Sequence, residues 1–154
     1  MLLSMSNREI VERALACFAD PARRPSYFDL YAEHVVLHGY AGVEPGLASV
    51  KRYYEAFWSA FPDAAVRHDD IVEGEDKMAL RYRITGTHLG PFLGIAPTGR
   101  PVSVAGMTML AFSAGKCVER WSIADSISLL AQLGVDVVPK RGVVGSPQAR
   151  PNLL

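Results

Sequence analysis

The sequence predicts an α+β fold in which helices pack on one face of a curved, mostly antiparallel sheet. Two observations predict this class: helical periodicity is concentrated in the first 61 residues, and β-type alternation fills residues 64–124. A third is the turn signal Ala114-Gly115, which joins the last two predicted strands as a hairpin. Helices first and a run of strands afterwards are typical of α+β domains.

The first helix is expected over residues 7–19. Ser6 and Glu9 have the spacing of a capping box, and the apolar positions that follow recur at helical intervals. Asp20-Pro21 ends the helix because the residue before a proline disfavours helical geometry.

The second part of the chain reads as a short helix, a strand, a loop and a longer helix. Tyr27, Leu30 and Tyr31 suggest the short helix, and His34–His38 alternate like a strand. Gly39–Gly46 read as loop. Leu47–Phe61 carry aromatic residues at helical spacing, and Pro62 stops this helix.

The remaining elements are four strands and a closing helical turn. The strands are expected at residues 64–73, 77–88, 101–113 and 117–124, and the turn at Ser126–Leu133. Residues 1–137 then form one domain, and residues 138–154, rich in proline and glycine, form an extended tail.

Composition narrows the function classes. In 154 residues, 16 basic and 16 acidic side chains cancel without a basic block, which gives nucleic acid no electrostatic support. No apolar run approaches the ~20 residues needed to span a bilayer, and we expect a cytoplasmic protein. Cys17 and Cys117 have no metal-ligand spacing and are expected as buried, reduced thiols.

One carboxylate has an unusual setting. Asp125 lies at the end of a strand in which Glu119, Trp121 and Ile123 occupy alternate positions, so that all four side chains share a face. An acid beside Trp and Ile either makes a structural hydrogen bond or transfers protons in a dry pocket. Asp125 also stands immediately before a predicted helix, where aspartate is a preferred cap. Both roles stay open.

Further pocket residues follow from strand parity and register. A regular two-residue hairpin pairs Leu110 with Glu119 and Thr108 with Trp121, which makes Thr108 a polar cavity candidate. In residues 77–88 the apolar parity includes Tyr82, while Arg81 and Arg83 face outward. From the aromatic helix, Phe57 is expected to face the cavity.

Two histidines end predicted strands. A neutral imidazole at His38 or His88 can polarise a carbonyl or orient a water, and each can equally be a structural histidine bonded to backbone. His34 and His68 are expected to face solvent. Among these histidines no pair has zinc-ligand spacing, and no metal site is expected.

The chain resembles the SnoaL-like polyketide cyclases (the ester cyclase group) of the NTF2-like superfamily. The resemblance covers about residues 8–134, and as a set the matching segments are specific for the family. They are Tyr31–His38, Phe61–Asp63, Gly74–Arg81, Gly86–His88, Gly90–Gly94, Pro97–Arg100, Gly115-Lys116, Glu119–Trp121, Asp125 and Gln132–Gly134.

The resemblance implies a cone-shaped sheet rolled around a deep pocket, usually in a homo-oligomer, here expected as a homodimer. In the characterised cyclases, an aspartate matching Asp125 is the general acid/base of an intramolecular aldol ring closure, without metal or cofactor. A histidine on the neighbouring strand assists there, but Val102–Phe112 contains none. His38 matches the family's pocket-facing histidine. Relatives also include epoxide hydrolases, isomerases and non-catalytic binding domains.

The resemblance thus implies a cofactor-independent enzyme that closes a ring in a hydrophobic secondary metabolite by an intramolecular aldol-type reaction. The alternatives are an epoxide hydrolase, an isomerase or a non-catalytic domain that binds small molecules. Asp125 and His38 are the expected catalytic residues. The expected substrate-binding residues are Phe57, Tyr82, His88, Thr108 and Trp121.

Overall fold

The computed structural model describes residues 5–138 and contains four α-helices, one 3₁₀ helix and five strands within that range. In chain order the elements are α1 (Asn7–Ala19), α2 (Arg24–Tyr27), η1 (Phe28–Leu30), β1 (Tyr31–His38), α3 (Leu47–Ala60), β2 (Ala65–Glu73), β3 (Lys77–Thr87), β4 (Pro101–Ser113), β5 (Lys116–Ala124) and α4 (Ser126–Gln132).

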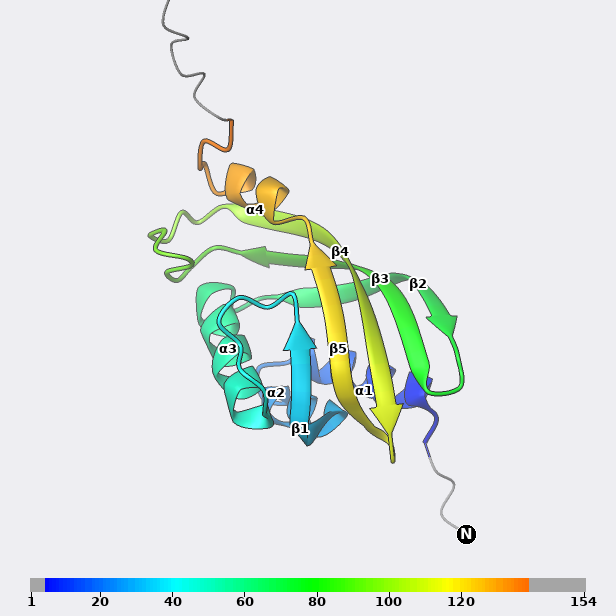
Figure 1. The fold of residues 1–154 in the computed structure, drawn as a ribbon. Helices are drawn as coiled ribbons and strands as arrows, with labels where there is room; N and C mark the ends of the chain where they lie inside the picture. The colour runs from blue at the N-terminus through cyan, green and yellow to red at the C-terminus, as the bar shows by residue number, and fades with distance from the viewer. Residues whose placement is uncertain (1–4, 139–154) are drawn as a thin grey trace, which may run out of the picture.

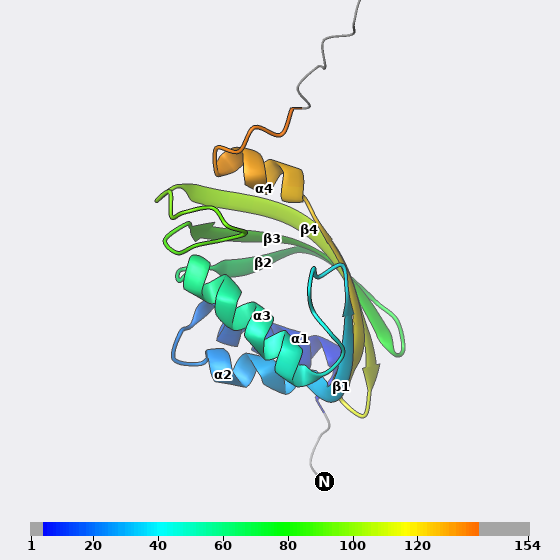
Figure 2. The same cartoon turned by 60° about the vertical axis from the view of Figure 1, so that its left-hand side comes forward.

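The five strands form one open, curved sheet in the order β1-β5-β4-β3-β2. Four strands pair antiparallel, and β1 joins the edge of the sheet parallel to β5. Helices α1 and α3 lie against the concave side of the sheet, whereas α4 lies at the end of the sheet opposite the N-terminus (Figures 1 and 2). The predicted α+β class with a curved, mostly antiparallel sheet is confirmed.

Local sequence signals account for most of the element boundaries. Helix α1 begins at the predicted capping box: the Glu9 amide donates to Ser6 Oγ at 3.2 Å, and Glu9 Oε2 accepts from the Ser6 amide at 2.7 Å. The predicted two-residue turn also forms, with both Ala114 and Gly115 at positive φ. The predicted short helix is divided between α2 and η1, and β1 starts three residues earlier than expected.

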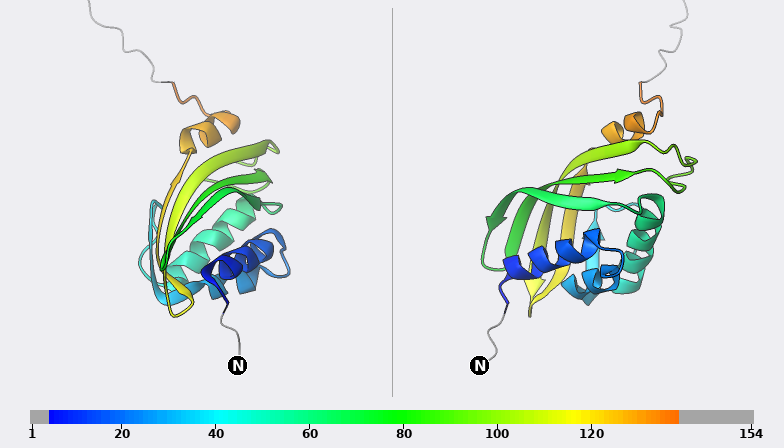
Figure 3. Two further views of the ribbon diagram at one scale, coloured as in Figure 1. Left: turned by 90° about the vertical axis from the view of Figure 1, so that its right-hand side faces the viewer. Right: turned by 180° about the vertical axis from the view of Figure 1, so that it is seen from behind.

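Helices α1 and α3 face the concave side of the sheet (Figure 3), and the main hydrophobic core is formed by buried residues of these helices and of the strands. Aromatic residues of α1, α2 and α3 pack edge to face there, as Phe18 does on Trp58 with ring centroids 5.3 Å apart. Cys17 and Cys117 are buried, unpaired thiols, as predicted, and burial raises the pKa of Cys117 to about 11. Within residues 5–138, no helix combines the length and apolarity that a bilayer crossing requires. Residues 139–154 of the expected tail lie outside the described range.

Gly39 closes β1 where the chain turns away from the sheet. Its φ is +83°, and a Cβ there would lie 1.9 Å from the carbonyl oxygen of Ser122 on β5. Gly42, in the same loop, has a similar φ of +75° but nothing within 4 Å of its Cβ position. The two glycines therefore separate the cost of a left-handed backbone from the cost of a collision with the sheet.

We predict that Gly42→Ala lowers the free energy of unfolding by about 1 kcal/mol, the cost of the left-handed backbone. Gly39→Ala should cost about 1–3 kcal/mol more, because the methyl group must push β5 aside. Urea denaturation of both variants measures the difference, and equal losses would contradict the close approach of Gly39 to Ser122.

Candidate functional site

A cavity of about 190 Å³ lies on the concave side of the sheet. Its walls come from α1, α3, α4 and the inward positions of β2, β3, β4 and β5. Most of the lining is apolar or aromatic; from the helices it includes Val11, Phe18, Tyr53, Tyr54, Phe57 and Leu129. Apolar walls with a few convergent polar groups are typical of small-molecule sites.

Arg120 is the only Arg, Lys, Asp or Glu among the described lining residues. Its Nε donates to Thr108 Oγ1 at 2.9 Å. Its Nη1 faces three tyrosine hydroxyls, at 2.6 Å from Tyr31, 3.2 Å from Tyr54 and 3.3 Å from Tyr27. The guanidinium carbon also lies 5.7 Å from the ring centroid of Tyr40, within the range of a cation–π contact.

Hydroxyl groups extend this cluster along one wall. Thr108 donates to the Trp121 carbonyl at 3.0 Å, so it can only accept from Ser122 Oγ, 2.7 Å away. The Ser122 proton is thereby used, and the contact of 3.0 Å between Ser122 and Tyr40 has the Tyr40 hydroxyl as donor. Arg120 and the Trp121 carbonyl thus fix the direction of the hydroxyl chain.

Burial determines the charge states of the cluster. It raises the pKa of Tyr27, Tyr31, Tyr40 and Tyr54, although the charge of Arg120 opposes it, so these phenols are neutral at pH 7. Burial by itself lowers the pKa of Arg120, but the surrounding tyrosine oxygens outweigh that effect and the pKa lies above its ordinary value. The cavity therefore carries one fixed positive charge.

Among the described residues, one histidine lines the cavity: His68 on β2. It is half-buried and lies directly across from Tyr82 in the β2–β3 pairing. Burial and the positive charge of Arg120 lower its pKa, and the negative charge of Glu12 opposes them in part. The imidazole is therefore neutral at pH 7 and able to accept a proton. The expectation that His68 faces solvent is wrong.

A β-bulge at Val118 determines which face of β5 meets the cavity. Cys117 pairs with Phe112 and Glu119 with Ala111, which leaves Val118 as an extra residue. From there on Leu110 pairs with Arg120 and Thr108 with Ser122, one residue away from the predicted register. Because side chains alternate along a strand, this shift turns Arg120 and Ser122 inward.

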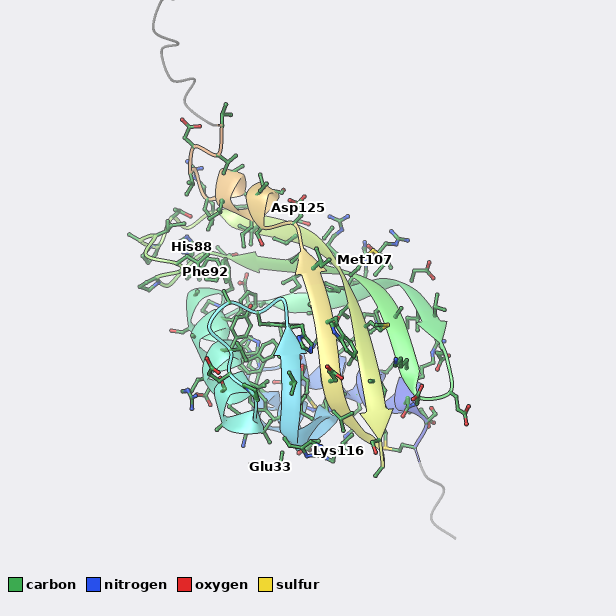
Figure 4. The ribbon with its side chains drawn as sticks, in the orientation of Figure 1. Glu33, His88, Phe92, Met107, Lys116 and Asp125 are labelled. Carbon is green, nitrogen blue, oxygen red and sulfur yellow. The ribbon has the colours of Figure 1, made fainter. Side chains whose placement is uncertain are left out.

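The expected placement of Asp125 in a dry pocket is wrong. The face that Glu119, Trp121, Ile123 and Asp125 were predicted to share is the outer face of the sheet, not the face toward the cavity. Asp125 is exposed and caps α4, with Oδ1 accepting the Ser128 amide at 3.0 Å. Figure 4 places it where β5 meets α4, and its neighbours Ala124 and Ser126 line the cavity although Asp125 does not.

The expected placement of His38 and Trp121 is also wrong, because both lie on the outer face. Their rings stack with centroids 5.3 Å apart, and His38 Nε2 is 2.8 Å from Glu119 Oε1. The side chains of His38 and Glu119 are 45% and 42% exposed. This cluster faces away from the cavity.

His88 is fully buried but does not line the cavity. Its Nδ1 accepts the Thr98 amide at 3.2 Å, which joins the end of β3 to the start of β4 and corresponds to the structural alternative for this residue. Since Nδ1 accepts, the neutral ring carries its hydrogen on Nε2, which has no hydrogen-bond partner among the described residues.

Phe57, Tyr82 and Thr108 do line the cavity. The Tyr82 ring lies over Gly106, its cross-strand neighbour, where a Cβ would be 2.4 Å from the phenol oxygen. The roles of these residues in substrate binding stay predictions. Within residues 5–138, no three His, Cys, Asp or Glu side chains are grouped so that they could hold a metal.

Sequence reasoning missed Arg120, Ser122, Tyr40 and His68. The sequence does contain one signal for Arg120, a cation in the middle of a predicted strand. The direction of the Arg120 side chain could not be derived, because the residues around Val118 give no sequence signal for the bulge. Tyr40 lies in a predicted loop, and His68 has charged neighbours that suggest an exposed position.

An α+β cone with an apolar cavity and one polar end defines a class of small-molecule-binding domains, and comparison with known proteins identifies the family. The family model of the SnoaL-like polyketide cyclases matches residues 9–133. The chain therefore belongs to the SnoaL-like polyketide cyclase family, which confirms the resemblance seen in the sequence. No curated protein matches the chain.

Solved structures agree with this assignment. IdmH from Streptomyces antibioticus, provisionally assigned as a polyketide cyclase, is similar at 29% identity and a TM-score of 0.73, over 85% of this chain and 100% of IdmH. AclR from Streptomyces galilaeus, provisionally assigned as a hydroxylase, has 29% identity and a TM-score of 0.73, over 83% of this chain and 95% of AclR. TsrD from Streptomyces laurentii has 25% identity and a TM-score of 0.73, over 86% of this chain and 98% of TsrD.

We predict that the imidazole of His68 titrates below the ordinary histidine pKa of about 6.5, because burial and Arg120 disfavour its charged form. The folded protein then binds fewer protons at this site than the unfolded chain. The resulting stability is present above about pH 6.5 and is lost as the pH falls through the folded pKa.

NMR titration of the imidazole resonances, with His68→Gln to assign the signal, measures this pKa. A His68 midpoint at or above about 6.5 would contradict the prediction.

Proposed function

We propose that this protein is a cofactor-independent acid/base enzyme that closes a ring in a hydrophobic carbonyl compound by intramolecular aldol addition. Family membership and the 29% identity with IdmH support a cyclase-type reaction. The observation that carries the proposal is the half-buried guanidinium of Arg120, held by neutral hydroxyls at the polar end of an apolar cavity.

An aldol ring closure makes two chemical demands on this site. A base removes a proton from the carbon next to a carbonyl, and negative charge develops on that carbonyl oxygen. The enolate carbon then forms a bond to a second carbonyl carbon, and the resulting alkoxide takes up a proton. Arg120 supplies a fixed positive charge for the enolate oxygen, and the mostly apolar walls around it strengthen such stabilisation relative to water.

His68 is the proposed proton acceptor. It lines the same cavity as Arg120, its lowered pKa keeps it neutral at pH 7, and the protonated ring can return the proton to the alkoxide. The tyrosines are poorer candidates because burial raises their pKa values.

Asp125 is the second candidate for proton transfer. Its neighbours Ala124 and Ser126 line the cavity, and no described residue donates a hydrogen bond to its Oδ2. Its exposure favours His68. For the other reactions of this fold, the absence of Asp and Glu from the described lining argues against a carboxylate-activated water that would open an epoxide.

The test is deuterium exchange from D₂O into the methyl group of 2-acetylnaphthalene, a flat ketone whose protons exchange slowly in buffer, followed by NMR. We predict that the protein accelerates exchange and that His68→Gln slows it about 100-fold, as expected for loss of a general base. Asp125→Asn retains a capping side chain and should keep the rate. His34→Gln, on the exposed side of β1, is the matched control.

Loss of exchange in Asp125→Asn with retention in His68→Gln would assign proton transfer to Asp125 instead. If the unmodified protein binds the ketone without accelerating exchange, the proposed enzymatic activity is wrong and the domain is a binding module.

The outer face of the sheet supports the further proposal that two copies of the chain associate there. Met107 on β4 and Ile123 on β5 are direct cross-strand neighbours, 61% and 80% exposed, and Met109 and Trp121 continue the apolar strip. Met107 lies on the convex side of the sheet, away from α1 and α3 (Figure 4). Exposed apolar strips of this kind often mark protein interfaces.

We predict that the double variant Met107→Glu/Ile123→Glu is monomeric in light scattering coupled to size exclusion, whereas the unmodified chain is dimeric. Charges placed in an apolar contact would have to be buried without partners. The matched control is Val72→Glu, which alters an exposed apolar residue at the edge strand β2. An unmodified chain that elutes as a monomer would exclude this interface.

A further inference from the structure

The positive charge of Arg120 has no negative partner within the described part of the protein. None of its hydrogen bonds goes to a carboxylate, and no ion pair includes it. Neutral hydroxyls and an aromatic face compensate part of the cost of taking the guanidinium out of water. Holding a cation partly out of water without a counter-ion is costly, so an anion that reaches Arg120 would be favoured there.

One edge of the guanidinium is still available. The hydrogen bonds of Arg120 use Nε and Nη1, and none uses Nη2, which carries two hydrogens. Nη2 is also absent from the fully buried nitrogens that lack a partner, which among the described residues are Trp58 Nε1 and His88 Nε2. It therefore keeps accessible surface. Because Arg120 is half-buried and lines the cavity, we take this edge as the part of the guanidinium that a ligand in the cavity can reach.

The surroundings of this nitrogen determine what kind of anion can reach it. The remaining lining is dominated by apolar and aromatic side chains, among them Phe57, Tyr53, Tyr82 and Phe92. Such walls favour a flat apolar skeleton over a hydrated inorganic ion, because aromatic faces contribute stacking and buried area but few hydrogen bonds. No lysine or second arginine lines the described cavity, which gives a phosphate group little support.

We infer that Arg120 Nη2 is the anchoring point for a ligand bound as an oxygen anion on a flat apolar skeleton, either a carboxylate or the enolate of a 1,3-dicarbonyl. In both groups the negative charge is shared by two oxygens in a plane, the geometry that a guanidinium binds well. This inference rests on the proposed function in taking the cavity as the substrate site, and it specifies the substrate class: a compound that enters the cavity already ionised or readily ionised.

The experiment compares matched pairs of probes by isothermal titration calorimetry. 2-Naphthoate is compared with 2-naphthamide, and 1,3-indandione, at a pH at which it is ionised, with the neutral 1-indanone. Each pair has the same ring skeleton and differs in charge. We expect the unmodified protein to bind the anionic member about 10- to 100-fold more tightly, the usual range for a hydrogen bond to a charged partner. If the anion binds more tightly only in the first pair, the ligand group is a carboxylate. If it binds more tightly only in the second pair, the group is an enolate.

Arg120→Met removes the charge while keeping a long side chain, and it should abolish the preference while leaving the binding of 2-naphthamide within a few-fold. Arg81→Met, on the outer face and 55% exposed, is the control that should change neither. If Arg120→Met does not fold, the comparison of probe pairs on the unmodified protein still decides the inference.

Equal or weaker binding of both anions by the unmodified protein would overturn the inference, as would a preference that survives in folded Arg120→Met. These outcomes are separate from the exchange assay. If the protein prefers the anions but does not accelerate exchange, the anion site stands and the proposed enzymatic function is wrong. If it accelerates exchange but does not prefer the anions, the enzymatic function stands and the anion site is wrong.

Discussion

The interior of this protein depends on the contact between one guanidinium and the hydroxyl groups around it. Arg120 is reached by tyrosines from α2, β1 and α3, and by a threonine from β4. These elements are far apart in the chain, so the contact joins the helical layer to the sheet. Because the partners are neutral, they orient the cation without cancelling its charge. The same arrangement that orders the core thereby gives the cavity its electrostatic character.

The bulge at Val118 makes that contact possible. Without the extra residue, Glu119 and Trp121 would share the face of Thr108, and the cavity would receive a carboxylate and an indole. With it, the carboxylate joins His38 on the outside and Arg120 turns inward. Because of one extra residue in the strand, the cavity contains a positive guanidinium in place of a negative carboxylate.

Much of the fold could be predicted because its signals are local. The capping box of α1, the stop at Pro62, the two-residue turn at Ala114-Gly115 and the alternation of the strands each depend on residues close in sequence. The site could not be predicted in the same way. The parity of residues 119–125 was correct, but the assignment of that parity to the cavity assumed a regular hairpin. Tyr40 and His68 were missed because their places depend on contacts with β5 and β3 rather than on neighbours in the chain.

Gly106 has a consequence for the width of the cavity. The phenol ring of Tyr82 can lie flat against β4 only because position 106 has no side chain. Any larger residue there would lift the ring into the interior and narrow the space available to a guest molecule. The residue at this single position on β4 therefore limits the thickness of the compound that the cavity can hold, and a larger residue there would restrict the cavity to thinner compounds without altering the charged end.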